Sequence, residues 1–169
     1  MRYIKFAVTG LVILFILLTL IGLLMPSSVT VMRTIEINNP ADSVHTYTNN
    51  IANWRYWING ADTAYFKQLT VSDSSKNSKI ILGNYTVTIT DTSSKYITTI
   101  WQSSNGSQQL NRLQLYSNAA NTTVVNWSFQ QQLKWYPWER LSAMLHDKVF
   151  GPSMEASLTK LKQVCEKDK

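Results

Sequence analysis

The longest unbroken apolar stretch of the chain lies near its N-terminal end, from Phe6 to Met25, and contains no charged residue. At about 1.5 Å per residue, a helix of this length is about 30 Å long, which matches the hydrocarbon core of a bilayer. Thr9 and Thr19 fit such a helix, because their hydroxyls can donate to carbonyls one turn back. The pattern predicts a transmembrane anchor in residues 1–26, followed by one domain in residues 27–169.

The charges around this stretch predict how the chain crosses the membrane. Arg2 and Lys5 lie on its N-terminal side, and the next positive charge, Arg33, comes well after the apolar run. By the positive-inside rule, the N-terminus stays in the cytoplasm and the domain of this single-pass protein is extracytoplasmic. The alternative is a cleaved signal peptide, whose apolar region is shorter, about 7–15 residues, and ends at small residues. Leu23–Pro26 occupy that place here, which favours the anchor.

After the anchor the pattern changes to alternation. Val29–Ile37 place apolar side chains on one face, with Arg33 among them, which predicts a strand. A helix is expected next, with Asn39 as its N-cap and Pro40 at its first position. A second short helical stretch is expected at Asn53–Trp57. Turn-forming residues separate the other predicted strands, which are Tyr65–Ser72, Lys79–Leu82, Tyr85–Asp91, Lys95–Gln102, Gln108–Ser117 and Thr122–Lys134.

The C-terminal part of the chain has the spacing of a helix. Apolar residues recur there at intervals of three or four within two runs. The first run is Trp138, Leu141, Leu145 and Val149, and the second is Leu158, Leu161 and Cys165. Gly151-Pro152 interrupts the two runs, and either a kink or two helices meeting there would suit the proline. An antiparallel sheet with one apolar face needs a cover, and this helix can supply it. The predicted fold class is therefore α+β, a curved antiparallel sheet with a long C-terminal helix.

Composition narrows the possible functions. The formal net charge of +6 falls to +4 once Arg2 and Lys5 are set aside. The remaining charges are scattered and lack the clustered basic face of nucleic-acid-binding proteins, so no nucleic-acid partner is expected. Cys165 is the single cysteine, which excludes an internal disulfide, and the sequence has no Cys/His spacing typical of a metal site.

Several short motifs, taken in order, resemble one known superfamily. They are Leu24–Ser28, Arg33–Ile37, Asn39–Val44, Asn53-Trp54 with Trp57, Trp135–Arg140, Gly151-Pro152, and Leu158 with Leu161-Lys162. Together they span nearly the whole chain and resemble the SRPBCC superfamily of START-like and polyketide cyclase-like proteins, most of all its single-anchor bacterial membrane members. The resemblance implies a helix-grip fold, in which the sheet wraps around the long helix and leaves an elongated apolar cavity.

The chain departs from the pattern of that superfamily at several places. His45 stands where relatives usually have an aromatic residue, and Ile58–Gly60 replace a Ser-Pro-Trp-like stretch. Ser157 occupies a position that is often glycine. The segment between Trp57 and Tyr85 is short and lacks a glycine-rich hairpin. These differences bear on the shape and the mouth of the implied cavity.

The sequence shows no catalytic constellation. His45 lies on the first predicted helix, and His146 is next to Asp147, but neighbouring helical residues point about 100° apart and form no dyad. Alternation places Glu36 on the solvent face of its strand. Arg140 could pair with a carboxylate, stack on a tryptophan or hold a ligand head group. No catalytic residue, metal ligand or cofactor is predicted.

The aromatic and methionine content is the better indication of function. Cavity and core share one face in the helix-grip architecture, so some of these side chains would line a ligand site, with a few polar groups for orientation. The candidates are Tyr85, Thr99, Trp101, Asn111, Trp127, Phe129, Met144, Leu145 and Met154. The preferred hypothesis is binding of a hydrophobic small molecule or lipid by a membrane-anchored extracytoplasmic domain, without catalysis.

Two alternatives remain open on the sequence. A polyketide cyclase-like or hydrolase-like enzyme acting on an apolar substrate would need a titratable group buried in the cavity. A protein-interaction module without a cavity would use a sheet edge, the pair Trp54 and Trp57, or the pair Trp135 and Trp138 to hold a membrane partner.

Overall fold

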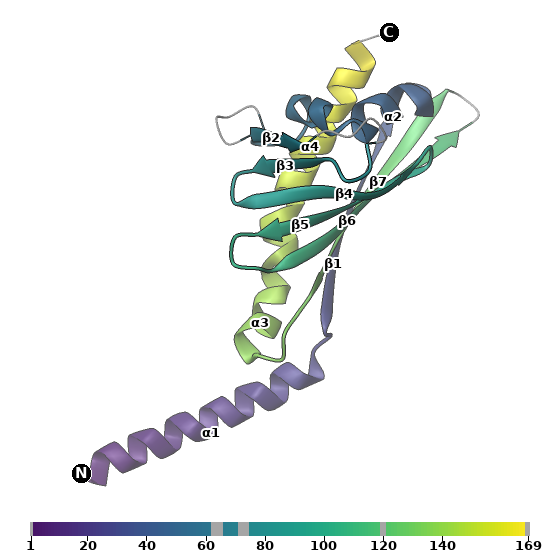
Figure 1. Cartoon of the computed structure of the whole chain (residues 1–169). Helices are drawn as coiled ribbons and strands as arrows, with labels where there is room; N and C mark the ends of the chain where they lie inside the picture. The colour runs from purple at the N-terminus through teal and green to yellow at the C-terminus, as the bar shows by residue number, and fades with distance from the viewer. Residues whose placement is uncertain (1, 62–65, 71–74, 119–120, 168–169) are drawn as a thin grey trace.

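The computed structural model describes residues 2–61, 66–70, 75–118 and 121–167 (Figure 1). The helices are α1 (Arg2–Leu24), α2 (Ala41–Asn49), α3 (Pro137–Ser142) and α4 (His146–Lys167), with the 3₁₀ helices η1 (Ile51–Tyr56) and η2 (Ala143–Leu145). The strands are β1 (Ser28–Ile37), β2 (Phe66–Thr70), β3 (Lys79–Leu82), β4 (Tyr85–Ser93), β5 (Tyr96–Ser103), β6 (Gln108–Asn118) and β7 (Thr122–Gln132).

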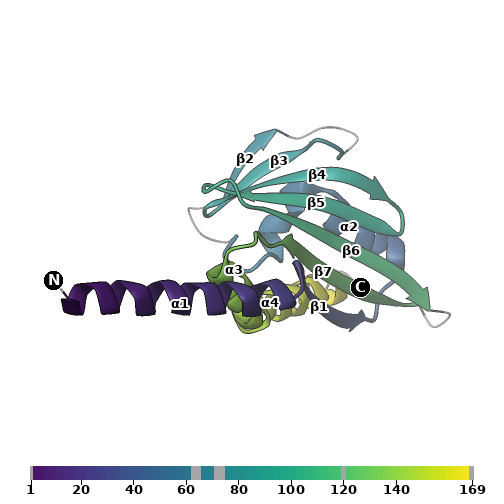
Figure 2. The same cartoon turned by 90° about the horizontal axis from the view of Figure 1, so that it is seen from below.

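The strands form one seven-stranded antiparallel sheet in the order β1-β7-β6-β5-β4-β3-β2. Strands β2 to β7 each pair with their neighbour in sequence, and β1 pairs with β7. The sheet curves around α4, and α2 and η1 lie beside the C-terminal half of that helix (Figures 1 and 2). This is the helix-grip fold that the sequence predicts.

The alternation along β7 and β1 produces the two faces of the sheet. Thr123, Val125, Trp127 and Phe129 of β7 are buried, while the residues between them are half-buried. Val31 of β1 is buried on the same side, directly opposite Phe129 in the register. A slip of one residue in either strand would turn this whole set toward solvent, so the register is strongly specified.

Arg33, the charged residue among the inward-facing positions of β1, lies across α4. Its Nη1 atom is 2.8 Å from Oδ1 of Asp147, and its Nε donates to Oε1 of Glu155 at 2.6 Å. Gly151, midway between the two carboxylates, makes room for it, because a Cβ there would overlap Nη2 and lie 3.0 Å from Cζ. The hydrogen bond from Arg33 lowers the pKa of Asp147, and the same bond raises the pKa of Arg33.

Two expectations about the helices are wrong. Asn39 is not an N-cap, because α2 has no side-chain cap and Nδ2 of Asn39 instead donates to the carbonyl of Cys165 at 2.6 Å. That bond satisfies a carbonyl near the end of α4, where the helix itself supplies no donor. Of the two alternatives at Gly151-Pro152, two helices meeting there is wrong, because one continuous helix runs through both residues. Pro152 lies inside α4 at an exposed position, and the irregular turn comes earlier, at η2.

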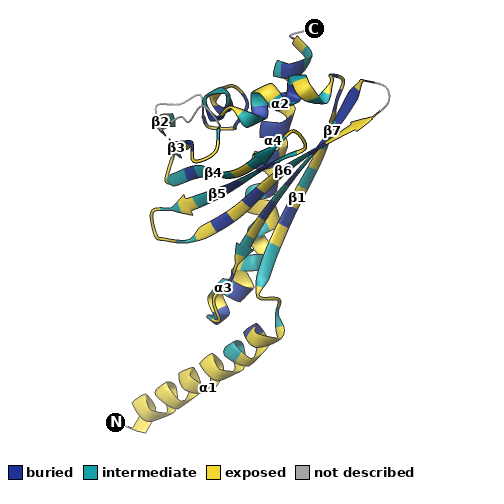
Figure 3. Cartoon of the chain, turned by 45° about the vertical axis from the view of Figure 1, so that its right-hand side comes forward, coloured by how far each residue is buried: buried dark blue, intermediate teal, exposed yellow. Residues whose placement is uncertain are grey.

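α1 projects away from the sheet, and nearly all of its side chains are exposed (Figure 3). It is long and apolar enough to cross a bilayer, with a mean hydropathy of 2.8 over its most apolar window. Thr9 and Thr19 donate to the carbonyls of Lys5 and Phe15 at 2.9 and 2.8 Å, as predicted. A helix that is apolar on all sides is unfavourable in water and suits a lipid environment.

The contact between Arg33 and Gly151 generates a stability prediction. Alanine normally stabilises an exposed helix interior by about 1 kcal/mol relative to glycine. We expect Gly151→Ala to gain much less than this, because the new Cβ displaces the guanidinium from its two carboxylates. In an Arg33→Ala background the same change should recover the gain of about 1 kcal/mol. Denaturant unfolding of the full chain in detergent micelles, followed by tryptophan fluorescence, measures both. Equal gains in the two backgrounds would contradict the contact.

The environment of Cys165 generates a second prediction. The side chain has no exposed surface, and burial raises the pKa of its thiol to about 11. The thiol is therefore protonated and a poor nucleophile at neutral pH. We expect negligible reaction with Ellman's reagent in the folded protein and one reactive thiol per chain in denaturant. Rapid labelling of the folded chain would show that the helix end is open.

Candidate ligand-binding cavity

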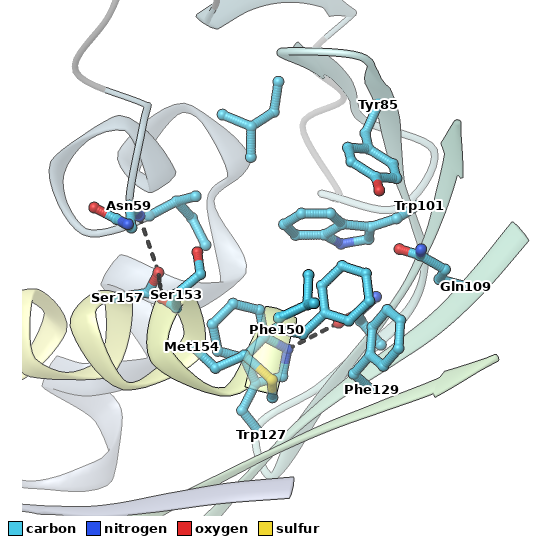
Figure 4. Close-up of a pocket in the computed structure, with 14 residues that line it drawn as sticks. Asn59, Tyr85, Trp101, Gln109, Trp127, Phe129, Phe150, Ser153, Met154 and Ser157 are labelled. Carbon is cyan, nitrogen blue, oxygen red and sulfur yellow. Dashed lines mark hydrogen bonds between the residues drawn. The ribbon is translucent and has the colours of Figure 1, made fainter. Parts of the chain in front are cut away.

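A cavity of about 320 Å³ lies between the concave face of the sheet, α4 and the loop after η1 (Figure 4). Its wall is formed by Ile58, Asn59, Leu82, Tyr85, Trp101, Gln109, Asn111, Trp127, Phe129, Val149, Phe150, Ser153, Met154 and Ser157. Most of these side chains are apolar or aromatic, with a few amides and hydroxyls among them. That composition is typical of small-molecule pockets, and the volume is near the lower end of their range of about 300–1,000 Å³.

Four tryptophans form a closed ring of contacts, of which Trp101 and Trp127 line the cavity while Trp54 and Trp57 lie behind them. Trp54 lies in η1 and Trp57 directly after it, Trp101 comes from β5 and Trp127 from β7, and neighbouring ring centroids lie 5.3–6.5 Å apart. Trp54 and Trp57 are completely buried, and their N–H groups donate to backbone carbonyls of α2 at 2.7 and 3.2 Å. With its polar atoms satisfied in this way, the aromatic cluster gives this part of the cavity wall a rigid support.

The side-chain amide of Asn111 in β6 is oriented by a hydrogen bond from a neighbouring tryptophan. Nε1 of Trp127 donates to its Oδ1 at 3.1 Å, and since an indole N–H can only donate, this bond identifies the oxygen end of the amide. The Nδ2 atom of Asn111 is buried and has no hydrogen-bond partner among the described residues. A buried donor without a partner costs about 1–3 kcal/mol. An acceptor oxygen on a ligand could recover that cost.

Ser157 of α4 holds the opposite wall together. Its hydroxyl accepts from the backbone N–H of Asn59 at 2.9 Å and donates to the carbonyl of Ser153 at 2.7 Å. The loop Ile58–Gly60 is thereby tied to α4 through Ser157. Asn59 and Ser153 remain exposed and form part of the cavity rim.

The structure brings most of the predicted site residues into this cavity. Six of them form part of its wall, namely Tyr85, Trp101, Asn111, Trp127, Phe129 and Met154. The strand register explains why they meet, because Asn111 stands opposite Thr99 on one side and Phe129 on the other. Thr99 is buried behind the wall, where its hydroxyl accepts from Nε1 of Trp101 at 3.1 Å, so it positions that ring.

Met144 and Leu145 lie outside the cavity, contrary to the expectation for them. Both belong to η2, and their exposed fractions are 70% and 54%. The expectation assumed that the C-terminal helix covers the sheet from Trp138 onward. Its contribution to the cavity wall instead begins at Val149 and Phe150, because α3 and η2 lie beyond the edge of the sheet (Figure 1).

Sequence reasoning missed several polar residues of the wall. A signal for Gln109 was present, because alternation along β6 places it on the same face as Asn111. Its Nε2 donates to Oε1 of Gln131 at 3.4 Å. Asn59 and Ser153 had no comparable signal, because their proximity depends on how the loop after η1 packs on α4.

The titratable residues considered for catalysis lie elsewhere. Nε2 of His45 is 2.9 Å from the carbonyl of Ser93, and Glu36 is exposed on its strand. Asp147 is paired with Arg33 and not with a histidine. Among the described residues that line the cavity, Tyr85 is the one titratable side chain.

Arg140 and the surface tryptophans also have clear positions. Arg140 is 9% exposed and donates to the carbonyls of Lys134 and Met25 at 3.0 and 2.6 Å, so it does not reach the cavity. Trp54 and Trp57 are buried and unavailable to a protein partner, contrary to one of the alternatives above. Trp135 and Trp138 are exposed.

No protein-family model and no curated protein matches the chain. A START superfamily protein from Mycobacterium smegmatis superposes with a TM-score of 0.63 at 12% identity, covering 83% of this chain and 99% of that one. A protein of unknown function from Staphylococcus aureus gives 0.64 at 11% identity, covering 83% and 96%. DynU16, a protein of the dynemicin biosynthetic locus, gives 0.59 at 12%, covering 85% and 49%. At these identities the similarity establishes a START-like fold.

The bond between Trp127 and Asn111 can be tested by substitution. Trp127→Phe keeps an aromatic ring but leaves the buried Oδ1 of Asn111 without its donor, and we expect a loss of about 1–3 kcal/mol in the free energy of unfolding. Trp138→Phe, at an exposed site, is the matched control and should change stability by less than about 0.5 kcal/mol. Denaturant unfolding of the full chain measures both, and equal effects would contradict a structural role for this bond.

Proposed function

We propose that this protein is a membrane-anchored, extracytoplasmic binding protein for a hydrophobic small molecule or lipid. The observation that supports this most directly is the apolar cavity with the unpaired amide donor of Asn111 in its wall. Tyr85 as the one titratable group in the described wall favours binding over acid–base catalysis. The fold shared with a START superfamily protein is consistent with this role.

The cavity indicates the kind of ligand. A volume of about 320 Å³ suits one small apolar molecule or part of one acyl chain better than a whole two-chain lipid. The apolar part would pack on Trp101 and on Phe129, which stacks with Phe150 at a centroid distance of 4.6 Å. A carbonyl, hydroxyl or carboxylate oxygen would accept from Nδ2 of Asn111. Met154 gives the wall a flexible side chain that adapts to different apolar shapes.

Membrane attachment would serve this function directly. In the proposal, residues 1–26 anchor the chain and residues 27–169 form the binding domain on the extracytoplasmic side. Apolar ligands partition into the bilayer, so a cavity tethered to it meets them at a high effective concentration.

Native mass spectrometry of the full chain, released from detergent micelles, tests the proposal. We expect a bound mass that disappears on denaturation. Ser153→Trp would place a large ring at the exposed rim of the cavity and should abolish most of the bound mass. Met32→Trp, at a position 52% exposed on the outer face of β1, is the matched control and should retain it. Asn111→Leu should weaken binding about tenfold, the equivalent of one hydrogen bond of about 1.4 kcal/mol.

Two results would count against this function. A full chain that carries no specific mass, and gains none after incubation with a total lipid extract, would contradict ligand binding. Equal loading of the Ser153→Trp and Met32→Trp variants would show that the bound molecule lies outside the cavity.

A further inference from the structure

An exposed apolar stripe follows α3, η2 and the first turn of α4. Its members, here named the α3–α4 patch, are Trp135, Trp138, Leu141, Met144, Leu145 and Val149, with exposed fractions of 38–70%. From Trp138 onward each member lies three or four residues from another, so they share one side of a helical segment. Large apolar side chains on soluble surfaces are usually scattered, and a contiguous group marks an interaction surface.

The α3–α4 patch is fixed beside the end of α1. Gly22 of α1 is buried against α3, where a Cβ would lie 3.3 Å from Cα of Pro137. Arg140 of α3 donates to the carbonyl of Met25, just past the end of α1, at 2.6 Å. Residues 25–27 alone connect α1 to β1. The rest of the molecule is therefore held close to the surface of any bilayer that α1 spans.

The length of α1 sets the depth of the patch. Its 23 residues extend about 35 Å as a helix, slightly more than the hydrocarbon core of about 30 Å. The last turn, which contains Gly22, then lies at the boundary between acyl chains and head groups. α3 lies beside this turn (Figures 1 and 2), so the patch is placed at the same level.

The side chains of this region suit the membrane interface. Tyr136 packs between Trp135 and Trp138, with centroid distances of 4.8 and 5.0 Å, and tryptophan and tyrosine are enriched at this boundary. Lys134 and Lys148 are exposed nearby and can reach anionic head groups.

The acidic side chains nearby are engaged within the protein. Oε2 of Glu139 accepts from the backbone N–H of Lys134 at 2.7 Å, and Asp147 pairs with Arg33 at 2.8 Å. The patch also reaches the cavity, because Val149 belongs to both.

We infer that the α3–α4 patch inserts into the outer interface of the same bilayer that α1 spans, so that the cavity opens at the lipid surface. This inference rests on the proposed anchoring by α1. It assigns the patch to lipid, in place of a protein partner or a second copy of the chain.

Site-specific fluorescence of the full chain in lipid nanodiscs tests the inference. An environment-sensitive nitrobenzoxadiazole label is placed at Met144→Cys or Val149→Cys in the patch, at Leu14→Cys inside α1, and at Tyr116→Cys. Tyr116 is 52% exposed and is the matched control, because it lies near the C-terminal end of β6, and this end of the strand is far from α1 (Figure 1). The native Cys165 is buried and does not compete for the label. Nanodiscs contain phosphatidylcholine and phosphatidylglycerol, with nitroxide lipids as quenchers.

We expect blue-shifted emission at both patch sites and quenching severalfold stronger than at Tyr116→Cys, greatest with nitroxides near the head group. Leu14→Cys should be quenched best by nitroxides deep in the acyl chains. Patch labels that behave like Tyr116→Cys, while Leu14→Cys remains quenched, would overturn the insertion and leave the anchoring intact. Absence of quenching at Leu14→Cys would instead overturn the anchoring. A shift that requires two copies per disc would assign the patch to a second copy.

Discussion

A single helix has to cover the concave face of a seven-stranded sheet, and this mismatch in width shapes the rest of the molecule. A helix with its side chains is about 10–12 Å across, whereas seven strands at about 4.8 Å span nearly 30 Å. α4 packs mainly on β1 at one edge, so most of the apolar face needs another cover. Trp54 of η1 and Trp57 directly after it supply part of this cover, and the uncovered remainder is the cavity.

Polar contacts at successive turns hold α4 in place. Arg33 binds carboxylates on either side of Gly151, Ser157 accepts from the loop after η1, and Asn39 donates to the carbonyl of Cys165. Apolar packing tolerates small shifts of a helix along a sheet, whereas hydrogen bonds with fixed partners do not. These contacts therefore set the register of α4, and with it which side chains face the cavity.

The sequence predicted the cavity wall where local periodicity determines the outcome. Alternation along β7 places Trp127 and Phe129 on the concave face of the sheet. Asn111 lies on the same face, because it is opposite Phe129 once β6 pairs with β7. Periodicity identified an apolar side of the C-terminal helix at Leu145, next to Met144, equally well. Periodicity could not show whether the sheet covers this apolar side, because that depends on where the sheet ends relative to the helix. The polar roles of Asn39 and Arg33 were likewise not predictable, since each bond joins segments more than 100 residues apart in the sequence.

The joint between α1 and α3 fixes how the apolar helix is placed relative to these features. The last carbonyls of a helix lack intrahelical donors, and lipid offers no water to replace them. Arg140 supplies N–H groups to carbonyls on both sides of the joint, at Met25 and Lys134, while Gly22 allows the backbones to approach. A buried guanidinium without these acceptors would be costly, so α1 and α3 stabilise each other's position. The orientation of the cavity relative to α1 is thus a property of the fold and not of a flexible tether.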